Sequence, residues 1–358
     1  MKKGYLVLEN GRIFEGKAFG ADAPRIGELV FETGMVGYVE AITDPSFYGQ
    51  IVLQTFPSAG NYGVCEEDFE GKPALFGFVV RDVTPVPSNY RSQYDLDTIM
   101  KKIGVMGICG IDTRAVTRIL RENGSMNAMI CTEIPEDLAP IREYRITKAV
   151  QHVTCEKEYT VEAQGEEKHR VTMIDYGAKK SIAENLAKRG CRVRVVPADT
   201  SAEEILKDDP DGIMLSNGPG DPKEAVGPIA EIKKMLGKKP VFGICLGHQL
   251  TALALGGDTA KLKYGHRGGN QPVRDLKSGR AYITSQNHGY AVLSDSLKGT
   301  GIESFVNAND GSCEGMVYPD LNCVTVQFHP EAASGPRDTA ILFDRFVKAM
   351  LKGGKINA

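Results

Sequence analysis

The segment VFGICLGHQL, residues 241–250, decides how the second half of the chain folds. Its apolar run ends at Cys245, which stands between Gly243 and Gly247, and a helix-like pattern follows directly. Glycines two residues before and two residues after a nucleophile permit a sharp strand–turn–helix corner, which lifts the side chain clear of the backbone. The amide groups and the positive dipole end of the helix would favour the thiolate form of the cysteine. The segment therefore predicts a nucleophile, although most free cysteines are small buried hydrophobes.

Strand-like and helix-like segments alternate on both sides of that corner. The strand-like ones are RVTMID (170–175), CRVRVVPA (191–198) and DGIMLS (211–216), and the helix-like ones are AKKSIAENLAKRG (178–190), SAEEILKD (201–208) and IAEIKKMLG (229–237). Residues 281–328 return to hairpin-like strands, and an amphipathic helix is expected over 337–353. Such alternation is typical of a mostly parallel sheet with helices on both faces, which binds ligands at the carboxyl ends of its strands. We predict this α/β fold for residues 170–358.

The first half of the chain has a different pattern. Short apolar segments at 5–14, 28–34, 50–56 and 75–83 are separated by Gly, Pro and Asp, and only 112–124 is clearly helical, with Asp112 as its cap and Gly124 as its stop. Asn10 and Gly11 form a strong hairpin signal, because both residues tolerate positive φ. We predict a smaller, sheet-rich α+β domain over 1–153, followed by a charged linker over 154–169.

Composition excludes several classes of protein. A length of 358 residues suggests two domains. The 43 basic and 46 acidic side chains leave a net charge of -3, which offers no electrostatic case for nucleic acid or anionic lipid. No apolar run is long enough for a membrane span or a signal peptide. The eight cysteines are scattered without close C-x-x-C spacing, so we expect a reducing, cytoplasmic setting.

A base for the thiol is found in CVTVQFHPEA, residues 323–332. A β-branched strand is expected to end at His329, and Pro330 keeps the chain extended, so that Glu331 projects to the same side as the histidine. Glu331 can then orient the imidazole, while His329 takes the thiol proton and returns it to a leaving group. Cys109, in GICGID, has neither a directly following helix nor such a partner, so Gly-Ile-Cys alone is not sufficient.

LSNGPGDP, residues 215–222, ends another predicted strand with a Gly-Pro-Gly turn. There the backbone can approach a ligand closely and direct N–H groups at a developing oxyanion. An ordinary turn is the alternative for this segment by itself. Among the remaining histidines, His248 follows the nucleophile on the new helix and is interpreted as a structural hydrogen-bonding group, and His152, His169 and His266 as solvated or structural.

Taken together, SNGPGDP (216–222), GICLGHQ (243–249), QNHGYAV (286–292) and FHPEA (328–332) resemble the sites of the class I, triad-type glutamine amidotransferases, in the same order. The first half, at 27–52 and 107–124, resembles the small, glutamine-hydrolysing chain of carbamoyl-phosphate synthetase. The resemblance implies Cys245 as nucleophile, His329 as base and acid, and Glu331 as the orienting carboxylate. It implies an oxyanion hole from the N–H groups of Gly218 and Leu246. Around glutamine it places Ser46, Gly218, Gly220, Leu246, Gln249, Asn287, Gly289 and Tyr290.

The resemblance also implies a partner. The chain contains no Gly-x-x-x-x-Gly-Lys-Ser/Thr phosphate loop, so ATP and Mg²⁺ are expected only on a large chain that uses the ammonia, and no cofactor or metal is expected here. The first domain is the expected docking part, in a heterodimer or a higher hetero-oligomer that serves arginine or pyrimidine biosynthesis. The loop EAASGPRD (331–338) differs from the sequence common in the family at this place, so the contacts that relatives make through this loop are not carried over. The alternatives are a glutaminase of another synthase, a non-catalytic scaffold and a cysteine peptidase.

Overall fold

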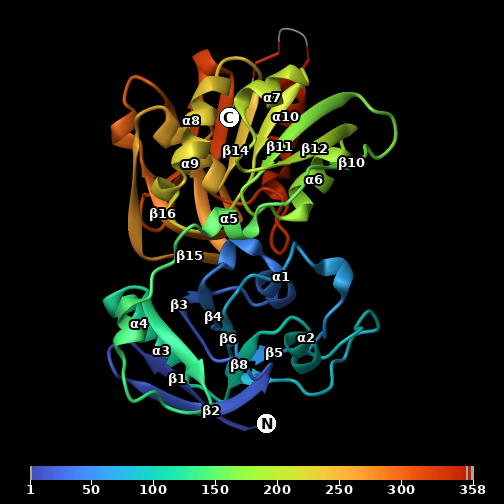
Figure 1. Ribbon diagram of the computed structural model, residues 1–358. Helices are drawn as coiled ribbons and strands as arrows, with labels where there is room; N and C mark the ends of the chain where they lie inside the picture. Colours follow the sequence, from blue (N-terminus) through green and yellow to red (C-terminus); the bar gives the residue numbers. More distant parts are fainter. Residues whose placement is uncertain (1, 352–353, 356–358) are drawn as a thin grey trace. The chain divides into compact units, whose positions relative to one another are not determined.

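The computed structural model describes residues 2–351 and 354–355 (Figure 1). The chain forms two compact units, the first comprising residues up to Thr147 together with Lys263–Arg267, and the second Lys148–Leu262 and the residues from Gly268 onward. The first unit therefore ends before the predicted boundary at 153. The predicted linker over 154–169 contains a strand, β10 (Tyr159–Val161), which pairs antiparallel with β12 (Cys191–Pro197). The charged residues of this segment therefore flank an edge strand, and the segment is not a free linker.

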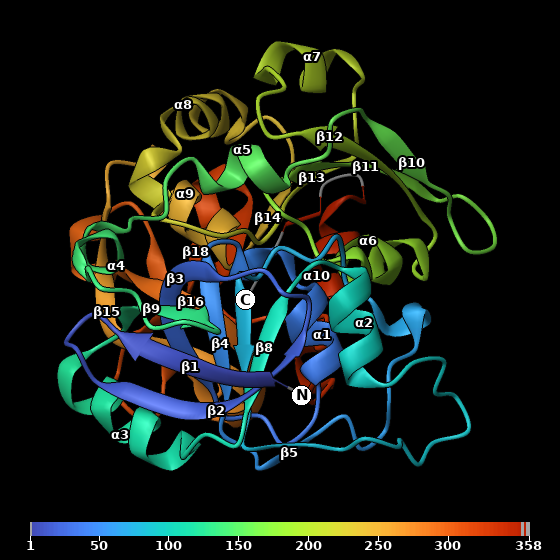
Figure 2. The ribbon, with the colours of Figure 1, turned by 60° about the horizontal axis from the view of Figure 1, so that its bottom comes forward.

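The first unit is a closed β-barrel, and Figure 2 shows β1, β2, β4 and β8 in it. Its strands, in barrel order, are β1 (Lys2–Leu8), β2 (Ile13–Gly20), β8 (Met106–Cys109), β6 (Gly77–Val79), β4 (Gln50–Gln54), β3 (Arg25–Glu32) and β9 (Met126–Cys131). β1 pairs with both β2 and β9, which closes the ring. Leu6, Leu29 and Ile51 belong to one fully buried core. Closure leaves this sheet without open edges, so it needs no partner strand.

The local signals of the first half are confirmed. Gly11 has φ +87°, and β1 and β2 form the hairpin that Asn10 and Gly11 predict. Helix α3 (Thr113–Asn123) begins after Asp112, which accepts a hydrogen bond from the N–H of Ala115, and ends at Gly124. Sequence reasoning missed the helices α1 (Tyr38–Thr43), α2 (Leu96–Lys102) and α4 (Ala139–Glu143) and the strand β5 (Ser58–Ala59) of this unit. β5 pairs with β7 (Asp82–Val83), which lies in the strand-like segment predicted at 75–83.

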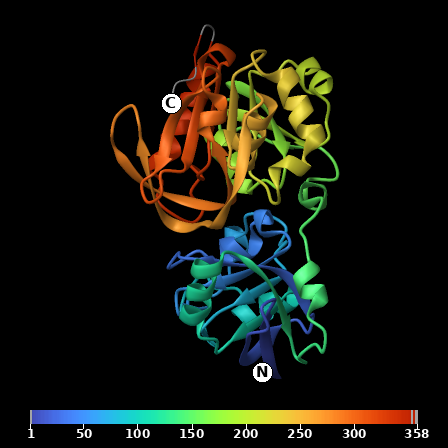
Figure 3. The same cartoon turned by 90° about the vertical axis from the view of Figure 1, so that its left-hand side faces the viewer.

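The second unit contains a ten-stranded mixed sheet. Its parallel part runs β12, β11 (His169–Asp175), β13 (Gly212–Leu215), β14 (Val241–Ile244) and β19 (Cys323–Val326). β18 (Cys313–Tyr318), β17 (Ile302–Asn307), β15 (Asp258–Asp275) and β16 (Ala281–Leu293) extend it beyond β19. Figure 3 shows the orange strands β15 and β16 at this end of the sheet. The α/β fold predicted for this half is confirmed.

Helices cover both faces of this sheet, as predicted. Ile213 and Leu215 of β13 pack into one core with α8 (Val226–Met235) and α9 (Leu246–Ala254). Met214 packs into the opposite core with α6 (Lys180–Ala187) and α10 (Ile341–Ala349). The helices α5 (Ala149–Val153) and α7 (Ala202–Lys207) complete this unit. The predicted last helix is therefore shorter than 337–353, of which residues 352–353 lie outside the described residues.

The strand order brings the predicted catalytic segments together. β14 and β19 are parallel neighbours in which Ile244 pairs with Val326, so the residues that follow both strands leave the sheet at the same edge. Cys245 follows one strand, and His329 lies shortly beyond the other. This edge is where open α/β sheets bind their ligands. Among the described residues, none of the helices is both long enough and apolar enough to cross a bilayer.

Candidate active site

Cys245 lies on the sharp corner that its glycines predict. It has φ +53° and ψ -101°, and α9 begins at the next residue. A side chain at Gly247 would lie 2.5 Å from the carbonyl oxygen of Leu215, and one at Gly243 would lie 2.9 Å from the Thr325 side chain. Only glycine therefore fits at either position without displacing the neighbouring strands. A left-handed φ at a non-glycine residue costs about 1–3 kcal/mol, which the packing around this corner offsets.

His329 and Glu331 form a buried pair beside the thiol. Nδ1 of His329 and Oε1 of Glu331 are 2.6 Å apart, and both residues are at least 95% buried. The N–H of His329 donates to the carbonyl of Ser285 at 2.8 Å, which fixes the backbone. Burial lowers the pKa of His329, but the Glu331 carboxylate and the adjacent Cys245 raise it by more, so the net shift is upward. An imidazolium that forms at this position is thus stabilised by its neighbours.

Lys179 is a further charged residue of the site. Its ammonium is 3.2 Å from Oε1 of Glu331, it also donates to the carbonyl of Ala333, and its side chain is 4% exposed. Burial raises the pKa of Glu331, but Lys179 and His329 outweigh it and hold that pKa well below its usual range. Glu331 is therefore a carboxylate that two cations hold in place. Sequence reasoning missed Lys179, although it lies just after strand β11, at the ligand-binding edge.

The predicted oxyanion-hole residues are neighbours. Gly218 follows β13, and a side chain at this position would lie 2.2 Å from the carbonyl of Tyr176 and 2.7 Å from the side chain of Leu246. The N–H of Gly247 donates to the carbonyl of Ser216 at 3.0 Å, which ties the loop after β13 to the start of α9. The structure therefore brings Gly218 and Leu246 together, while their role toward an oxyanion stays a prediction.

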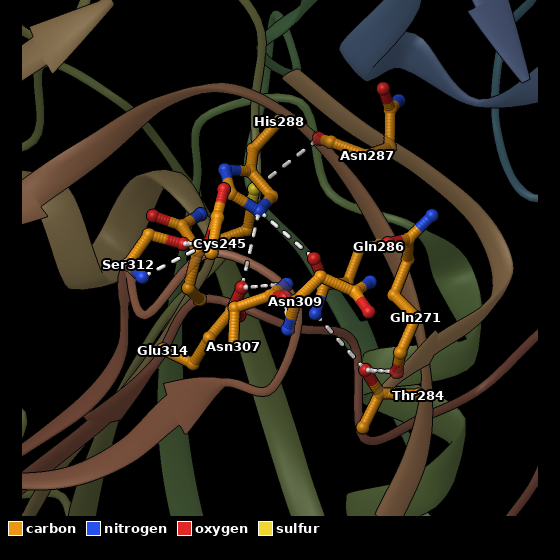
Figure 4. Close-up of polar contacts among 12 residues, drawn as sticks. Cys245, Gln271, Thr284, Gln286, Asn287, His288, Asn307, Asn309, Ser312 and Glu314 are labelled. Carbon is orange, nitrogen blue, oxygen red and sulfur yellow. Dashed lines mark hydrogen bonds and ion pairs between the residues drawn. The ribbon is translucent and has the colours of Figure 1, made fainter. Parts of the chain in front are cut away.

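Several residues predicted around glutamine also lie near Cys245. Sγ of Cys245 donates to the carbonyl of Asn287 at 3.6 Å, a contact that Figure 4 shows. Nε2 of Gln249 donates to the carbonyl of Tyr290 and to Oε1 of Gln327, each at 2.9 Å. Gly289 lies between Asn287 and Tyr290 on β16, so it belongs to the same segment.

The other two predicted glutamine residues are described by their own surroundings. Gly220 has φ +92°, and a side chain there would meet that of Ala149 at 2.8 Å. Ser46 belongs to the first unit, where it is buried in the short turn Pro45–Phe47 and donates its N–H to Asp44. A role of either residue in binding glutamine stays a prediction.

Comparison with known proteins decides the family. The carbamoyl phosphate synthase small chain of Clostridium perfringens is 49% identical over 355 residues, which cover 98% of this chain and 100% of the relative. That of Listeria monocytogenes serotype 4b is 49% identical over 98% of this chain and 97% of the relative. The chain belongs to the carbamoyl phosphate synthase small-chain family. The family model for the small-chain CPSase domain matches residues 6–130, and that for the class-I glutamine amidotransferases matches residues 172–349.

These matches confirm both parts of the resemblance noted in the sequence. The small-chain match covers most of the barrel unit, and the amidotransferase match covers most of the sheet unit. Membership of this family supports the role of glutaminase subunit. The roles of individual residues are a separate matter and depend on the geometry described above.

Two buried histidines of this small chain lie close to the site without belonging to the predicted triad. Nδ1 of His248 is 2.7 Å from Oγ1 of Thr325, and burial lowers the pKa of His248 to about 3. His248 is therefore a neutral structural residue, as the sequence indicates. His288 on β16 is 4% exposed and was not singled out by sequence reasoning. Its only signal was its place in QNHGYAV, directly after Asn287.

Proposed function

We propose that Cys245, His329 and Glu331 hydrolyse the side-chain amide of L-glutamine. One observation supports this above all: a cysteine on a strained strand–helix corner adjoins a histidine whose other nitrogen is 2.6 Å from a buried carboxylate. A nucleophile, a base and a group that orients the base are the three parts that nucleophilic catalysis needs. The family supports glutamine as the substrate and a large synthase chain as the partner.

In the first half of the reaction, Nε2 of His329 removes the proton of Sγ, and the thiolate attacks the carboxamide carbon. The oxyanion that forms accepts hydrogen bonds from the N–H groups of Gly218 and Leu246. His329 then gives its proton to the amide nitrogen, the C–N bond breaks, and ammonia leaves a glutamyl thioester. In the second half, His329 takes a proton from water, which attacks the thioester. The C–S bond breaks, Sγ regains the proton, and glutamate is released.

The electrostatics of the site suit these steps. The Asn287 carbonyl can only accept a hydrogen bond, so its contact with Sγ fits the thiol form and not the thiolate. Removal of the thiol proton therefore depends on His329, whose raised pKa favours the imidazolium that forms. Glu331 keeps its negative charge beside that cation, because Lys179 also lowers its pKa. Lys179 is thus a positioning residue, acting through Glu331.

The ammonia must be used by a partner. We assign its use to a large, ATP-dependent chain that makes carbamoyl phosphate from bicarbonate, since this chain lacks the sequence of a phosphate loop. ATP and Mg²⁺ belong to that chain in this proposal, with no cofactor or metal on this one, and the first unit carries the docking surface. A cytoplasmic hetero-oligomer without nucleic-acid or membrane partners agrees with the net charge of -3.

Replacement of Cys245 by alanine tests the proposal. In the complex with the large chain of the same organism, Cys245→Ala should abolish carbamoyl phosphate synthesis from glutamine. Synthesis from added ammonia should continue, because ammonia needs no thiol. Loss of both activities would assign a structural role to Cys245, and retention of both would exclude the triad. Hydrolysis of peptide amides by the wild type would instead favour the cysteine peptidase.

A further inference from the structure

Behind the 286–290 segment of β16 lies a group of buried polar side chains that the hydrolytic steps do not use (Figure 4). They come from three strands and include Thr284, Gln286, His288, Asn307 and Glu314. Each is at least 95% buried, and Glu314 is 0% exposed. Buried polar groups are costly unless they are paired, so their hydrogen bonds define which protons they carry.

At one end, this group of side chains is bonded to a backbone carbonyl, which can only accept a hydrogen bond. Oγ1 of Thr284 lies 2.9 Å from the carbonyl of Gln271 and must donate its single proton there. The hydroxyl then accepts from Nε2 of Gln286, at 3.1 Å. This orients the Gln286 amide, so that its Oε1 faces Nε2 of His288 at 3.1 Å. An amide oxygen only accepts, and Nε2 of His288 must therefore carry a proton.

At its other end, the group is also bonded to a backbone carbonyl, that of Tyr290. Nδ1 of His288 is 2.8 Å from the carbonyl oxygen of Tyr290, so this nitrogen must also donate. A neutral imidazole has one N–H and cannot serve two acceptors at once. Both contacts can be hydrogen bonds only if His288 is an imidazolium, with both ring nitrogens protonated.

Glu314 supplies the opposite charge. Its Oε1 is 3.8 Å from Nε2 of His288 and accepts a hydrogen bond from Nδ2 of Asn307 at 3.0 Å. Neither ion is exposed to solvent by more than 4%. Removing one partner of a buried ion pair leaves an uncompensated charge. A buried imidazolium that loses its carboxylate partner therefore gives up a proton and becomes neutral. The charge of His288 thus depends on the Glu314 carboxylate.

The segment held by this pair contacts the catalytic machinery. The carbonyl of Asn287 accepts the Cys245 thiol, and the carbonyl of Tyr290 accepts both His288 and Gln249. We propose that Glu314 is a positioning residue of the glutaminase site, which keeps His288 doubly protonated and so holds the 287–290 backbone against Cys245 and Gln249. This inference rests on the proposed function of Cys245.

The Glu314→Gln variant tests the proposal, because it keeps the shape and an acceptor for Asn307 but removes the charge. In wild-type protein labelled with ¹⁵N-histidine, both His288 nitrogens should have the chemical shifts of a protonated ring at neutral pH. In Glu314→Gln one of them should shift to the unprotonated range. In the complex, kcat/KM for glutamine should fall by at least about tenfold, while ammonia-dependent synthesis stays within about twofold of the wild type.

Asp275→Asn is the matched control. Asp275 is a buried carboxylate of the same sheet, but its side chain accepts hydrogen bonds from the N–H of Lys277 and the hydroxyl of Ser278. This variant should lower the melting temperature without changing kcat/KM. The double variant Glu314→Gln/Gln286→Glu returns a carboxylate to the Nε2 side of His288. It should restore the second protonated nitrogen and at least half of the lost kcat/KM.

Two results would overturn the proposal. One is a wild-type His288 with an unprotonated ring nitrogen, which needs no variant and so decides the question even if Glu314→Gln does not fold. The other is a folded Glu314→Gln protein with wild-type kcat/KM for glutamine. Failure of the proposed function would look different, because Cys245→Ala would then still hydrolyse glutamine.

Discussion

The chain contains Gly-Ile-Cys twice, and only one copy, at Cys245, lies in the setting proposed for catalysis. Cys109 ends β8 in the barrel and is followed by Gly110, Ile111 and the cap Asp112 before a helix begins. Cys245 is itself the residue before its helix and has a left-handed φ. Burial is the largest influence on the Cys109 thiol and raises its pKa. A reactive cysteine is thus made by the corner and its partners, and not by the tripeptide.

The largest expected difference between the two copies is kinetic. Cys245→Ala should lower the kcat of glutamine hydrolysis by at least about 10⁴-fold, as the loss of other catalytic nucleophiles does. Cys109→Ala should leave kcat within about twofold, because Cys109 belongs to a core of the barrel unit. A steady-state glutaminase assay on both purified variants measures this. Comparable losses in both would mean that the barrel cysteine takes part in the chemistry.

Removal of the Glu331 carboxylate, which accompanies Cys245 and not Cys109, should have the next largest effect on kcat. Glu331→Gln keeps the side-chain shape but no longer orients a charged imidazole, so kcat should fall by about 10²–10⁴-fold. Lys179→Met should lower kcat less, by about tenfold, because the carboxylate remains but its counter-charge is lost. Rates of the two variants, measured side by side, give the order. A larger loss in Lys179→Met would assign Lys179 a direct role toward the substrate.

The pKa shifts of Glu331 and His329 predict how the stability of the protein depends on pH. The lowered folded-state pKa of Glu331 contributes stability that is present above the unfolded pKa of about 4.3 and is lost as the pH falls through the folded value. The raised pKa of His329 contributes stability that is present below about 6.5 and is lost as the pH rises through the folded value.

The free energy of unfolding of the wild type should therefore exceed that of Glu331→Gln most between about pH 4.5 and 6.5. The difference should shrink on both sides of this range. Urea denaturation of both proteins across the pH range measures it. A difference that does not vary with pH would mean that the pair is not ionised in the folded state.

Substitutions of the glycines that follow the two cysteines should differ less in their effects on stability and activity. A side chain at Gly247 would lie 2.5 Å from the Leu215 carbonyl, so Gly247→Ala should cost about 2–3 kcal/mol and lower activity by displacing the corner. At Gly110, which has φ +79°, an added side chain would lie 3.8 Å from its nearest neighbour, the Cα of Gly16. Gly110→Ala should cost only about 1 kcal/mol and spare activity. Chemical denaturation and a glutaminase assay distinguish the two variants.

The helix caps should show the smallest effect. Asp112 caps α3 through the N–H of Ala115, whereas Cys245 offers no side-chain cap to α9. Asp112→Ala should therefore cost about 1 kcal/mol, without a change in kcat. A thermal melt measures this. Any change in kcat would link the end of the barrel to the glutaminase site.

The amino-acid sequence alone was enough to predict the elements that depend on local spacing. Alternating strands and helices indicated the α/β unit, the glycines around Cys245 indicated the corner, and His-Pro-Glu placed base and acid on one side. Each of these signals involves residues a few positions apart, whose geometry follows from the backbone. The hairpin at Asn10 and Gly11 and the cap at Asp112 were predicted for the same reason.

Only the tertiary structure decided what depends on distant segments. The barrel closes because β1 and β9 pair, although they lie far apart in the chain, and β10 joins the sheet although charged residues flank it on both sides. Lys179 lies against Glu331, and Glu314 lies against His288, because strands that are separated in sequence end at the same edge or pack behind it. Charge balance in a buried site is a property of the folded chain, since burial and neighbours set which groups are ionised.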